Sequence, residues 1–235
     1  MFLIKIGRLR LDRPAIAFTL NGRETRAQIQ KAKRLGARIL ELRIDRFPQI
    51  SSKPLFQKIR SYRKMGFPLI ATIRSKKEGG GRFIPDSKRI ELFKTLLPWV
   101  DAVDLELASA HLTKVLVPLA RRKGKQVILS YHNFRQTPPD PVLTNLLRKA
   151  KKKRANFVKI VATPKNPDDV ARLLLFTERN RDQHLITISM GRLGQPTRVL
   201  APLFGSLLTY GSLGRPEAPG QLSISRLSKE IKIFS

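Results

Sequence analysis

"NFVKIVATPKNPDDVARLLLFTERNR" (156–181) contains the repeating unit of this chain, a short apolar strand followed by an amphipathic helix. Its first seven residues are mostly apolar and partly β-branched, which is typical of a buried strand. Pro167, followed by two aspartates, indicates the start of a helix. One residue does not fit a plain buried strand, because Lys159 lies in the middle of the apolar run.

The same alternation recurs along the chain. Apolar runs occur at 15–20, 38–44, 68–74, 100–107, 126–132, 156–162, 185–190 and 206–211. Helix-like segments fill the gaps, for example 23–35, 86–97, 109–122, 141–153 and 167–181. Strands that alternate with helices favour a parallel sheet, and eight such units in 235 residues predict an α/β fold, a closed (β/α)8 TIM barrel. An open doubly wound sheet is the alternative, but no G-x-G-x-x-G follows a strand.

No segment has the composition of a linker, so residues 1–235 are expected to form a single barrel domain. Residues 2–12, "FLIKIGRLRLD", alternate between apolar and polar side chains. This pattern predicts an N-terminal β-hairpin, which we expect to close the barrel floor.

The charge balance is unusual. Lys and Arg number 47 and Asp and Glu number 17, so the formal net charge is +30, which favours anionic partners such as nucleic acid, anionic lipid or small anionic substrates. Basic clusters at 121–125 and 148–154 lie at the ends of helix-like segments, where cations favour the helix dipole. Aromatic residues make up 7% and do not interleave with basic ones as in base-stacking surfaces. A solvated basic surface is the simpler interpretation, and non-specific nucleic-acid contact stays an alternative.

Cysteine is absent, which excludes disulfides and thiolate metal sites and fits a reducing compartment. No signal peptide is recognisable, and no apolar run approaches the roughly 20 residues of a membrane span. We therefore expect a cytoplasmic protein.

Polar residues gather at the expected C-terminal ends of the strands, where the chemistry of such barrels takes place. They are Thr19, Glu41, Arg43, Asp45, Arg74, Glu78, Asp104, Glu106, Ser130, His132, Lys159, Ser189, Arg198 and the loop 217–221. Because side chains alternate between faces, Lys159 shares a face with Phe157 and Val161, while the other face of that strand is wholly apolar and should meet the helices. Lys159 therefore points into the barrel, where His132 on the neighbouring strand can reach the same small molecule.

Each of these residues also has a structural interpretation. Glu41, Arg43 and Asp45 fit an internal ion-pair network, and His132 fits a hydrogen-bonded structural histidine. Lys159 is different, because an amine desolvated among apolar residues loses its proton more readily and becomes a nucleophile.

Seven segments in a fixed order extend this set over nearly the whole chain. They are "ELRIDRF" (41–47), "ATIRSKKEGG" (71–80), "VDLEL" (103–107), "SYHNF" (130–134), "FVKIVAT" (157–163), "SMGRLGQPTR" (189–198) and "APGQLS" (218–223). Together they resemble the type I 3-dehydroquinate dehydratases of the shikimate pathway. The resemblance implies a (β/α)8 barrel preceded by a hairpin, a homodimer, and a hydro-lyase that needs no cofactor and no metal.

The resemblance also implies roles for individual residues. Lys159 matches the lysine that forms a Schiff base with the substrate ketone, His132 the general acid and base, and Glu78 the carboxylate that orients this histidine. Glu41 and Arg43 match residues that hold the ring hydroxyls. The substrate-binding residues implied in this way are Thr19, Glu41, Arg43, Arg74, Met190, Arg198, which pairs with the substrate carboxylate, and Gln221, which closes over the substrate.

One position departs from the family pattern. Glu217 stands where members frequently have Ser, immediately before "APGQ". A carboxylate there would repel an anionic substrate, so Glu217 either turns outward, toward Arg215, or weakens closure of the loop.

The reaction implied is the dehydration of 3-dehydroquinate to 3-dehydroshikimate, the third step of chorismate biosynthesis. A protonated imine on Lys159 would draw electrons from the neighbouring carbon, and the arginines of the pocket are expected to keep the amine neutral. Two alternatives remain at this point. Another Schiff-base barrel, such as a class I aldolase, would share Lys159, and a basic nucleic-acid-binding barrel protein would explain the charge.

Overall fold

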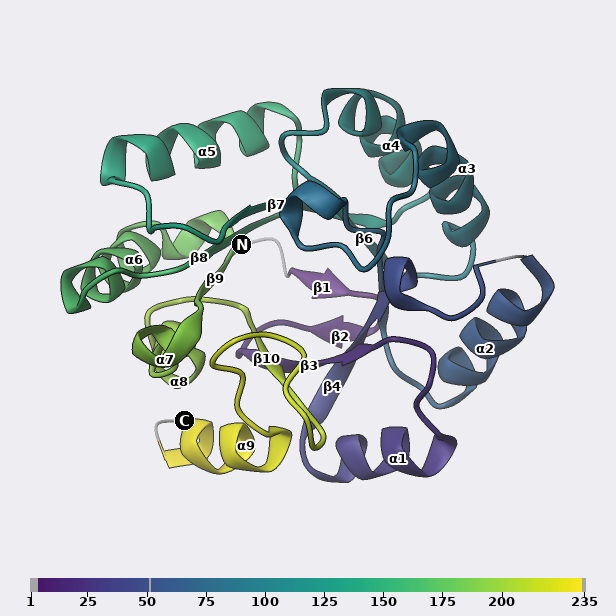
Figure 1. Ribbon diagram of the computed structural model, residues 1–235, viewed down its shortest axis with the longest axis horizontal. Coiled ribbons are helices and arrows are strands. Elements are labelled where there is room, and N and C mark those ends of the chain that lie inside the picture. The colour runs from purple at the N-terminus through teal and green to yellow at the C-terminus, as the bar shows by residue number, and fades with distance from the viewer. Residues whose placement is uncertain (1–3, 51, 234–235) are drawn as a thin grey trace.

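A nearly closed barrel of eight parallel strands forms the centre of the computed structural model, which describes residues 4–50 and 52–233 (Figure 1). In sheet order the strands are β10 (Leu208–Gly211), β3 (Ala15–Leu20), β4 (Ala37–Arg43), β5 (Leu69–Thr72), β6 (Ala102–Glu106), β7 (Gln126–Asn133), β8 (Phe157–Ala162) and β9 (Leu185–Ser189). The two strands at the ends of this order, β10 and β9, lie close together as well. The N–H of Leu207, directly before β10, donates to the carbonyl oxygen of Leu185, the first residue of β9, at 2.8 Å. The predicted (β/α)8 barrel is therefore confirmed.

Helices surround the barrel on its outside (Figure 1). They are α1 (Arg26–Arg34), α2 (Ser52–Lys64), α3 (Asp86–Leu96), α4 (Ala110–Arg122), α5 (Asp140–Lys152), α6 (Pro167–Arg179), α7 (Gly191–Gly194), α8 (Thr197–Leu203) and α9 (Ile224–Ile233), with short 3-10 turns η1 (Ile44–Arg46), η2 (Lys76–Glu78) and η3 (Arg181–Gln183). The start of α6 at Pro167 is as predicted, and the side chain of Asn166 caps it by accepting from the N–H of Asp169.

Side chains on the two faces of the strands form two separate apolar clusters, as the alternation predicts. On β8, Val158 and Ile160 pack in the outer cluster between strands and helices, whereas Phe157 and Val161 belong to the cluster inside the barrel. Lys159, between the latter two, therefore projects into the barrel.

A short antiparallel hairpin, β1 (Lys5–Ile6) and β2 (Leu9–Arg10), lies within the ring of strands in Figure 1. Ile6 is fully buried and packs in the inner cluster with residues that begin the barrel strands. Burying a side chain of this size contributes about 1.5–3 kcal/mol. The hairpin predicted for 2–12 closes the barrel floor as expected, and its positions 2 and 3 lie outside the described residues.

Across residues 4–50 and 52–233, no helix combines the length and the apolar character that crossing a membrane requires.

Candidate active site

A cavity of about 280 Å³ opens among the C-terminal ends of the barrel strands. All ten residues that the sequence analysis selected line it, namely Thr19, Glu41, Arg43, Arg74, Glu78, His132, Lys159, Met190, Arg198 and Gln221. They come from four of the eight barrel strands, from three of the loops that follow strands, and from α8. Residues far apart in the sequence are therefore brought to one chamber.

Lys159 lies at the base of this chamber, 5% exposed, in the middle of β8. Its Nζ lies 3.1 Å from Asp104 Oδ2 and 3.3 Å from Glu41 Oε2. It also donates to the hydroxyl of Tyr210 at 3.1 Å. The amine is thus held by side chains from three other strands, β4, β6 and β10, and lines the cavity.

The surroundings of Lys159 differ from the sequence expectation in one respect. Arginines were expected to stand beside the amine, but its nearest charged neighbours are the two carboxylates. The arginines have acidic partners of their own, because Arg43 forms a two-bond pair with Asp45 and Arg74 pairs with Asp104 at 2.9 Å. Buried cations require such partners, so the charges of the barrel interior are largely matched before any ligand binds.

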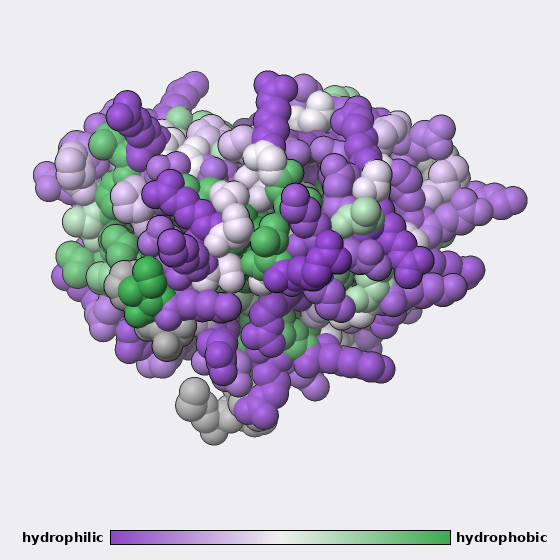
Figure 2. Space-filling view, turned by 90° about the horizontal axis from the view of Figure 1, so that it is seen from below, coloured by the Kyte–Doolittle hydropathy of each residue, from purple (hydrophilic) through white to green (hydrophobic). Residues whose placement is uncertain are grey.

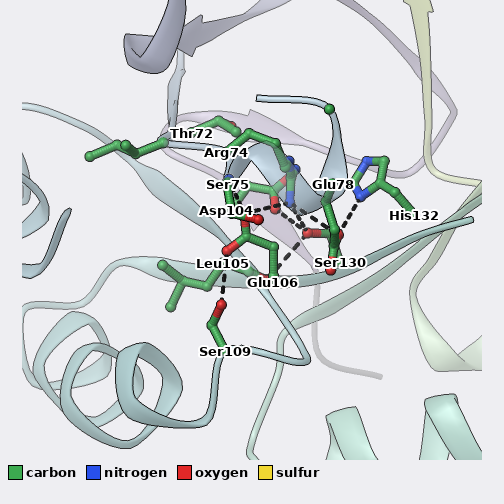
Figure 3. A network of polar contacts seen from close by, with 12 residues as sticks. Thr72, Arg74, Ser75, Glu78, Asp104, Leu105, Glu106, Ser109, Ser130 and His132 are labelled. Atoms are coloured by element: carbon green, nitrogen blue, oxygen red, sulfur yellow. Dashed lines mark hydrogen bonds and ion pairs between the residues drawn. The ribbon is translucent and has the colours of Figure 1, made fainter. Parts of the chain in front are cut away.

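Arg74 is the centre of a buried polar network (Figure 3). Its guanidinium donates to Ser130 Oγ at 2.6 Å and lies within 4 Å of Glu106 and Glu78. Although burial alone would raise it, the charges of Arg74 and Lys159 hold the pKa of Asp104 below its usual range. Asp104 therefore stays ionised and anchors both cations.

His132 and Glu78 form a second unit beside this network. Nδ1 of His132 lies 2.9 Å from Glu78 Oε2 (Figure 3), which leaves Nε2 as the ring atom available for other contacts. The turn that carries Glu78 requires glycine, because a Cβ on Gly80 would stand 2.2 Å from the carbonyl oxygen of Arg74. The glycines of "EGGG" (78–81) thus position the carboxylate of Glu78 beside His132.

The protonation of this pair is set by burial. Burial, together with the negative charges of Glu106 and Asp104, raises the pKa of Glu78 to about 7, although Arg74 acts in the opposite direction. Burial and the positive charges of Arg74 and Lys159 hold the pKa of His132 well below its usual range. At neutral pH the imidazole is therefore uncharged and suited to accept a proton.

Arg198 covers the other side of the cavity. It is 2% exposed, its Nε has no hydrogen-bond partner among the described residues, and Nη2 donates to the carbonyl oxygen of Pro219 at 3.2 Å. Burial lowers the pKa of Arg198 to about 10. A buried guanidinium with an unpaired N–H is a site prepared for an anion.

The loop between β10 and α9 lies over this arginine. Gln221 accepts the N–H of Glu217 through its Oε1 at 2.7 Å, so its amide NH₂ remains for another partner. Glu217 itself does not pair with Arg215. Its Oε2 contacts Arg46 Nη1 at 2.8 Å, and both side chains line the cavity.

Three residues of the site were not selected from the sequence. Tyr210 shares the inward face of β10 with Leu208, so the alternation rule would have identified it. Asp104 was noted as a polar strand residue without a role, and its contact with Lys159 supplies one. No sequence signal indicated Arg46, because its pairing with Glu217 depends on two loops 171 positions apart.

Within the described part of the chain, no group of three or more His, Cys, Asp or Glu side chains is arranged to hold a metal ion.

Comparisons with known proteins agree with this geometry. The family model described as Type I 3-dehydroquinase matches residues 18–234. The 3-dehydroquinate dehydratases of Methanocella arvoryzae and Aquifex aeolicus are 37% and 36% identical to this chain, over 87% and 93% of its length and 91% and 98% of theirs.

Solved structures give the same result. The 3-dehydroquinate dehydratase of Geobacillus kaustophilus superposes with a TM-score of 0.90 at 28% identity, over 99% of this chain and 96% of that one. The structure of the Aquifex aeolicus enzyme gives a TM-score of 0.85 at 36% identity, over 94% of this chain and 98% of that one.

Proposed function

The chain belongs to the type I 3-dehydroquinase family, and on that premise we propose that it dehydrates 3-dehydroquinate to 3-dehydroshikimate through an imine on Lys159. The family membership makes it a hydro-lyase, and it decides against an aldolase-type Schiff-base enzyme and against nucleic-acid binding as its main function. What remains to be tested is the role of each residue.

One observation carries the imine route. Lys159 is a buried amine on the inner face of the barrel that opens on a cavity, with a neutral histidine on one side and an incompletely paired arginine on the other. A purely structural lysine would need its carboxylate partners but not the cavity. The arrangement fits a ketone at Lys159, its α-carbon near His132 and a carboxylate at Arg198.

The chemistry follows from these positions. The amine attacks the ketone and water leaves, giving a protonated imine that acts as an electron sink. Nε2 of His132 removes a proton from the adjacent carbon, and the electrons move into the imine to form an enamine. The same histidine then returns the proton to the hydroxyl on the next carbon, which departs as water. Hydrolysis of the remaining imine releases the product and restores Lys159.

Attack requires the amine to lose its proton and to leave its ion pairs. Besides Asp104, which stays ionised, Glu41 Oε2 lies 3.3 Å from Lys159 Nζ, so the departing proton has a carboxylate within reach. Burial, with the negative charge of Glu41, raises the pKa of Tyr210 well above its usual range. Tyr210 therefore stays a neutral hydroxyl that steers the amine.

Borohydride trapping tests the proposal directly. Reduction in the presence of 3-dehydroquinate should add one reduced adduct to the protein mass, and peptide mapping should place it on Lys159. An adduct on another lysine, or none while turnover proceeds, would show that the imine role is assigned wrongly.

The pH profile of kcat/KM tests the pair of Glu78 and His132. When Glu78 is ionised it accepts the Nδ1–H of His132, and Nε2 is free to take a proton. When Glu78 is protonated it donates to Nδ1, and Nε2 carries the hydrogen instead. Because the pKa of Glu78 is raised to about 7, we expect kcat/KM to fall about tenfold per unit below that pH.

Glu78→Gln provides the control for this profile. Glutamine does not titrate, so the acid limb should move down by at least about one unit, to the limb of His132 itself, whose pKa lies lower. The plateau rate should also drop, since the amide orients the imidazole less strictly. An unchanged acid limb in Glu78→Gln would show that Glu78 does not set it.

Three broader properties are proposals as well. We propose that residues 1–235 act as one domain, that the protein is cytoplasmic, and that it forms a homodimer. The absence of cysteine fits a reducing compartment, and the dimer follows from the family resemblance. Light scattering coupled to size exclusion measures the assembly.

A second property is suggested by a basic groove at the floor of the barrel, opposite the active site. This groove of about 590 Å³ has no Asp or Glu in its lining. Its cations are Arg8, Arg13, Lys33, Arg34, Arg38 and Lys232. Hydrophilic side chains also cover most of the face seen in Figure 2. We propose that the groove makes non-specific contact with nucleic-acid phosphates.

Salt titration of duplex DNA binding by fluorescence anisotropy tests this contact. The triple variant Arg8→Gln, Arg13→Gln, Lys232→Gln should weaken binding about tenfold and reduce the salt slope by about 2–3. The matched control replaces Arg148, Lys149 and Lys152 on α5, which are also exposed. Equal losses of DNA affinity in the two triple variants would mean that binding depends on net charge and not on the groove.

A further inference from the structure

A negative charge stands at the mouth of a cavity built for an anion. Glu217 lies in the loop between β10 and α9 and lines the same cavity as Arg198. Placed there without a partner, its carboxylate would oppose the carboxylate of the substrate, and the sequence analysis expected a weakened loop or a turn toward Arg215. A turn toward Arg215 is not seen, because Glu217 has a partner on the opposite rim.

That partner is Arg46, in η1 directly after β4. Arg46 Nη1 lies 2.8 Å from Glu217 Oε2 and 3.5 Å from the backbone oxygen of the same residue. Asn21, in the loop after β3, donates from Nδ2 to Glu217 Oε1 at 3.2 Å. Three loops that follow β3, β4 and β10 thus meet on one carboxylate.

The same loop reaches the substrate-binding groups. The N–H of Glu217 donates to Gln221, and Arg198 donates to the carbonyl oxygen of Pro219 in between. Holding Glu217 therefore also holds the segment 217–221 against the guanidinium of Arg198.

Three of the other cations of the cavity are paired with carboxylates elsewhere, and Arg198 donates to the carbonyl oxygen of Pro219. Arg43 is paired with Asp45, Arg74 with Asp104, and Lys159 with Asp104 and Glu41. Arg46 is the cation that the structure pairs with Glu217. Its side chain is 28% exposed and that of Glu217 is 30% exposed, so the pair is open to the space that a ligand enters. A pair this exposed contributes little to folding stability, and its effect is expected on binding.

We propose that Arg46 and Glu217 form an electrostatic latch, in which Arg46 cancels the charge of Glu217 toward the anionic substrate and so allows the 217–221 loop to close over it. The inference rests on the proposed function, because it needs a substrate with a carboxylate. Arg46 is a positioning residue here, since it acts through Glu217 and the loop. Glu217 is tolerated in place of the serine common in the family because Arg46 stands opposite it.

Steady-state kinetics with 3-dehydroquinate test the latch through four variants. Arg46→Met leaves Glu217 uncompensated, so KM should rise about tenfold while kcat changes less than about twofold. The rise should shrink at high salt, as expected for charge repulsion at an exposed site. Adding Glu217→Ser to Arg46→Met should restore KM to within about twofold of the wild type, because the repelling charge is gone.

Arg215→Met is the matched control. Like Arg46→Met, it removes one positive charge, but from the loop that carries Glu217, two residues before it. Arg215 is exposed and makes no ion pair among the described residues. It should leave KM unchanged within about twofold. Glu217→Ser alone should leave KM at or below the wild-type value, since Arg46 then faces the substrate freely.

The outcomes separate this inference from the proposed function. Wild-type protein without turnover of 3-dehydroquinate would refute the function and the latch together. If the wild type is active, any of three results would refute the latch. They are an unchanged KM in Arg46→Met, a double variant whose KM stays as high as that of Arg46→Met, and an equal rise of KM in Arg215→Met.

Discussion

Lys159→Met should lower kcat/KM for 3-dehydroquinate on the order of 10⁴-fold or more, the size of loss seen when a covalent route is removed. Methionine nearly fills the volume of lysine, so the loss reports chemistry and not a cavity in the barrel. Asp104 keeps Arg74 as its partner and Glu41 keeps the hydroxyl of Thr72, so neither carboxylate is left alone. An ultraviolet assay for the conjugated product measures the rate.

Borohydride trapping on the same variant separates an inactive site from a misfolded one. Lys159→Met should give no adduct and retain the circular dichroism spectrum of the wild type. The matched control is Lys153→Met, a partly buried lysine that binds Thr113 outside the cavity and should keep both adduct and activity. Appreciable turnover in Lys159→Met would overturn the imine mechanism.

His132→Ala has the second largest expected effect. Loss of a positioned acid–base group lowers kcat by about 10²–10⁴-fold. The imine should still form, because Lys159 and its three partners are intact. Borohydride should therefore trap an adduct on a variant that hardly turns over, and the trapped substrate should still carry its hydroxyl.

The control for this variant is His111→Ala, on an exposed position of α4 away from the cavity. It should behave as the wild type. If His132→Ala kept near-normal turnover, His132 would be a structural residue. A different group would then have to accept the substrate proton, and the pH dependence assigned to Glu78 would need another explanation.

Much of this site could be predicted before the structure. Alternation along β8 identified Lys159 as an inward residue, and the pairing of β7 with β8 brings His132 beside Val161, two residues beyond Lys159 on the same face. The order of strands and helices is enough to bring these positions to one end of a barrel, because parallel strands share their C-terminal edge. The ten selected residues accordingly line one cavity.

The charge partners could not be predicted in this way. The sequence suggested that arginines would keep Lys159 neutral and that Glu217 would either turn outward toward Arg215 or weaken closure of the loop. Instead Arg43 and Arg74 are matched to Asp45 and Asp104, and Glu217 meets Arg46. A buried charge takes whichever opposite charge lies within about 4 Å, and that depends on loop conformation.

The family resemblance implied Lys159 and His132 as the reactive amine and histidine, whereas the sequence patterns themselves determined the barrel and the inward face of each strand. These follow from local rules, since apolar periodicity and strand alternation act over a few residues. Only the tertiary structure decided which carboxylate holds Lys159, why the turn after Arg74 needs Gly80, and how Arg46 reaches across the mouth to Glu217. Those contacts join loops distant in the chain, and their geometry exists only once the strands have closed into a ring.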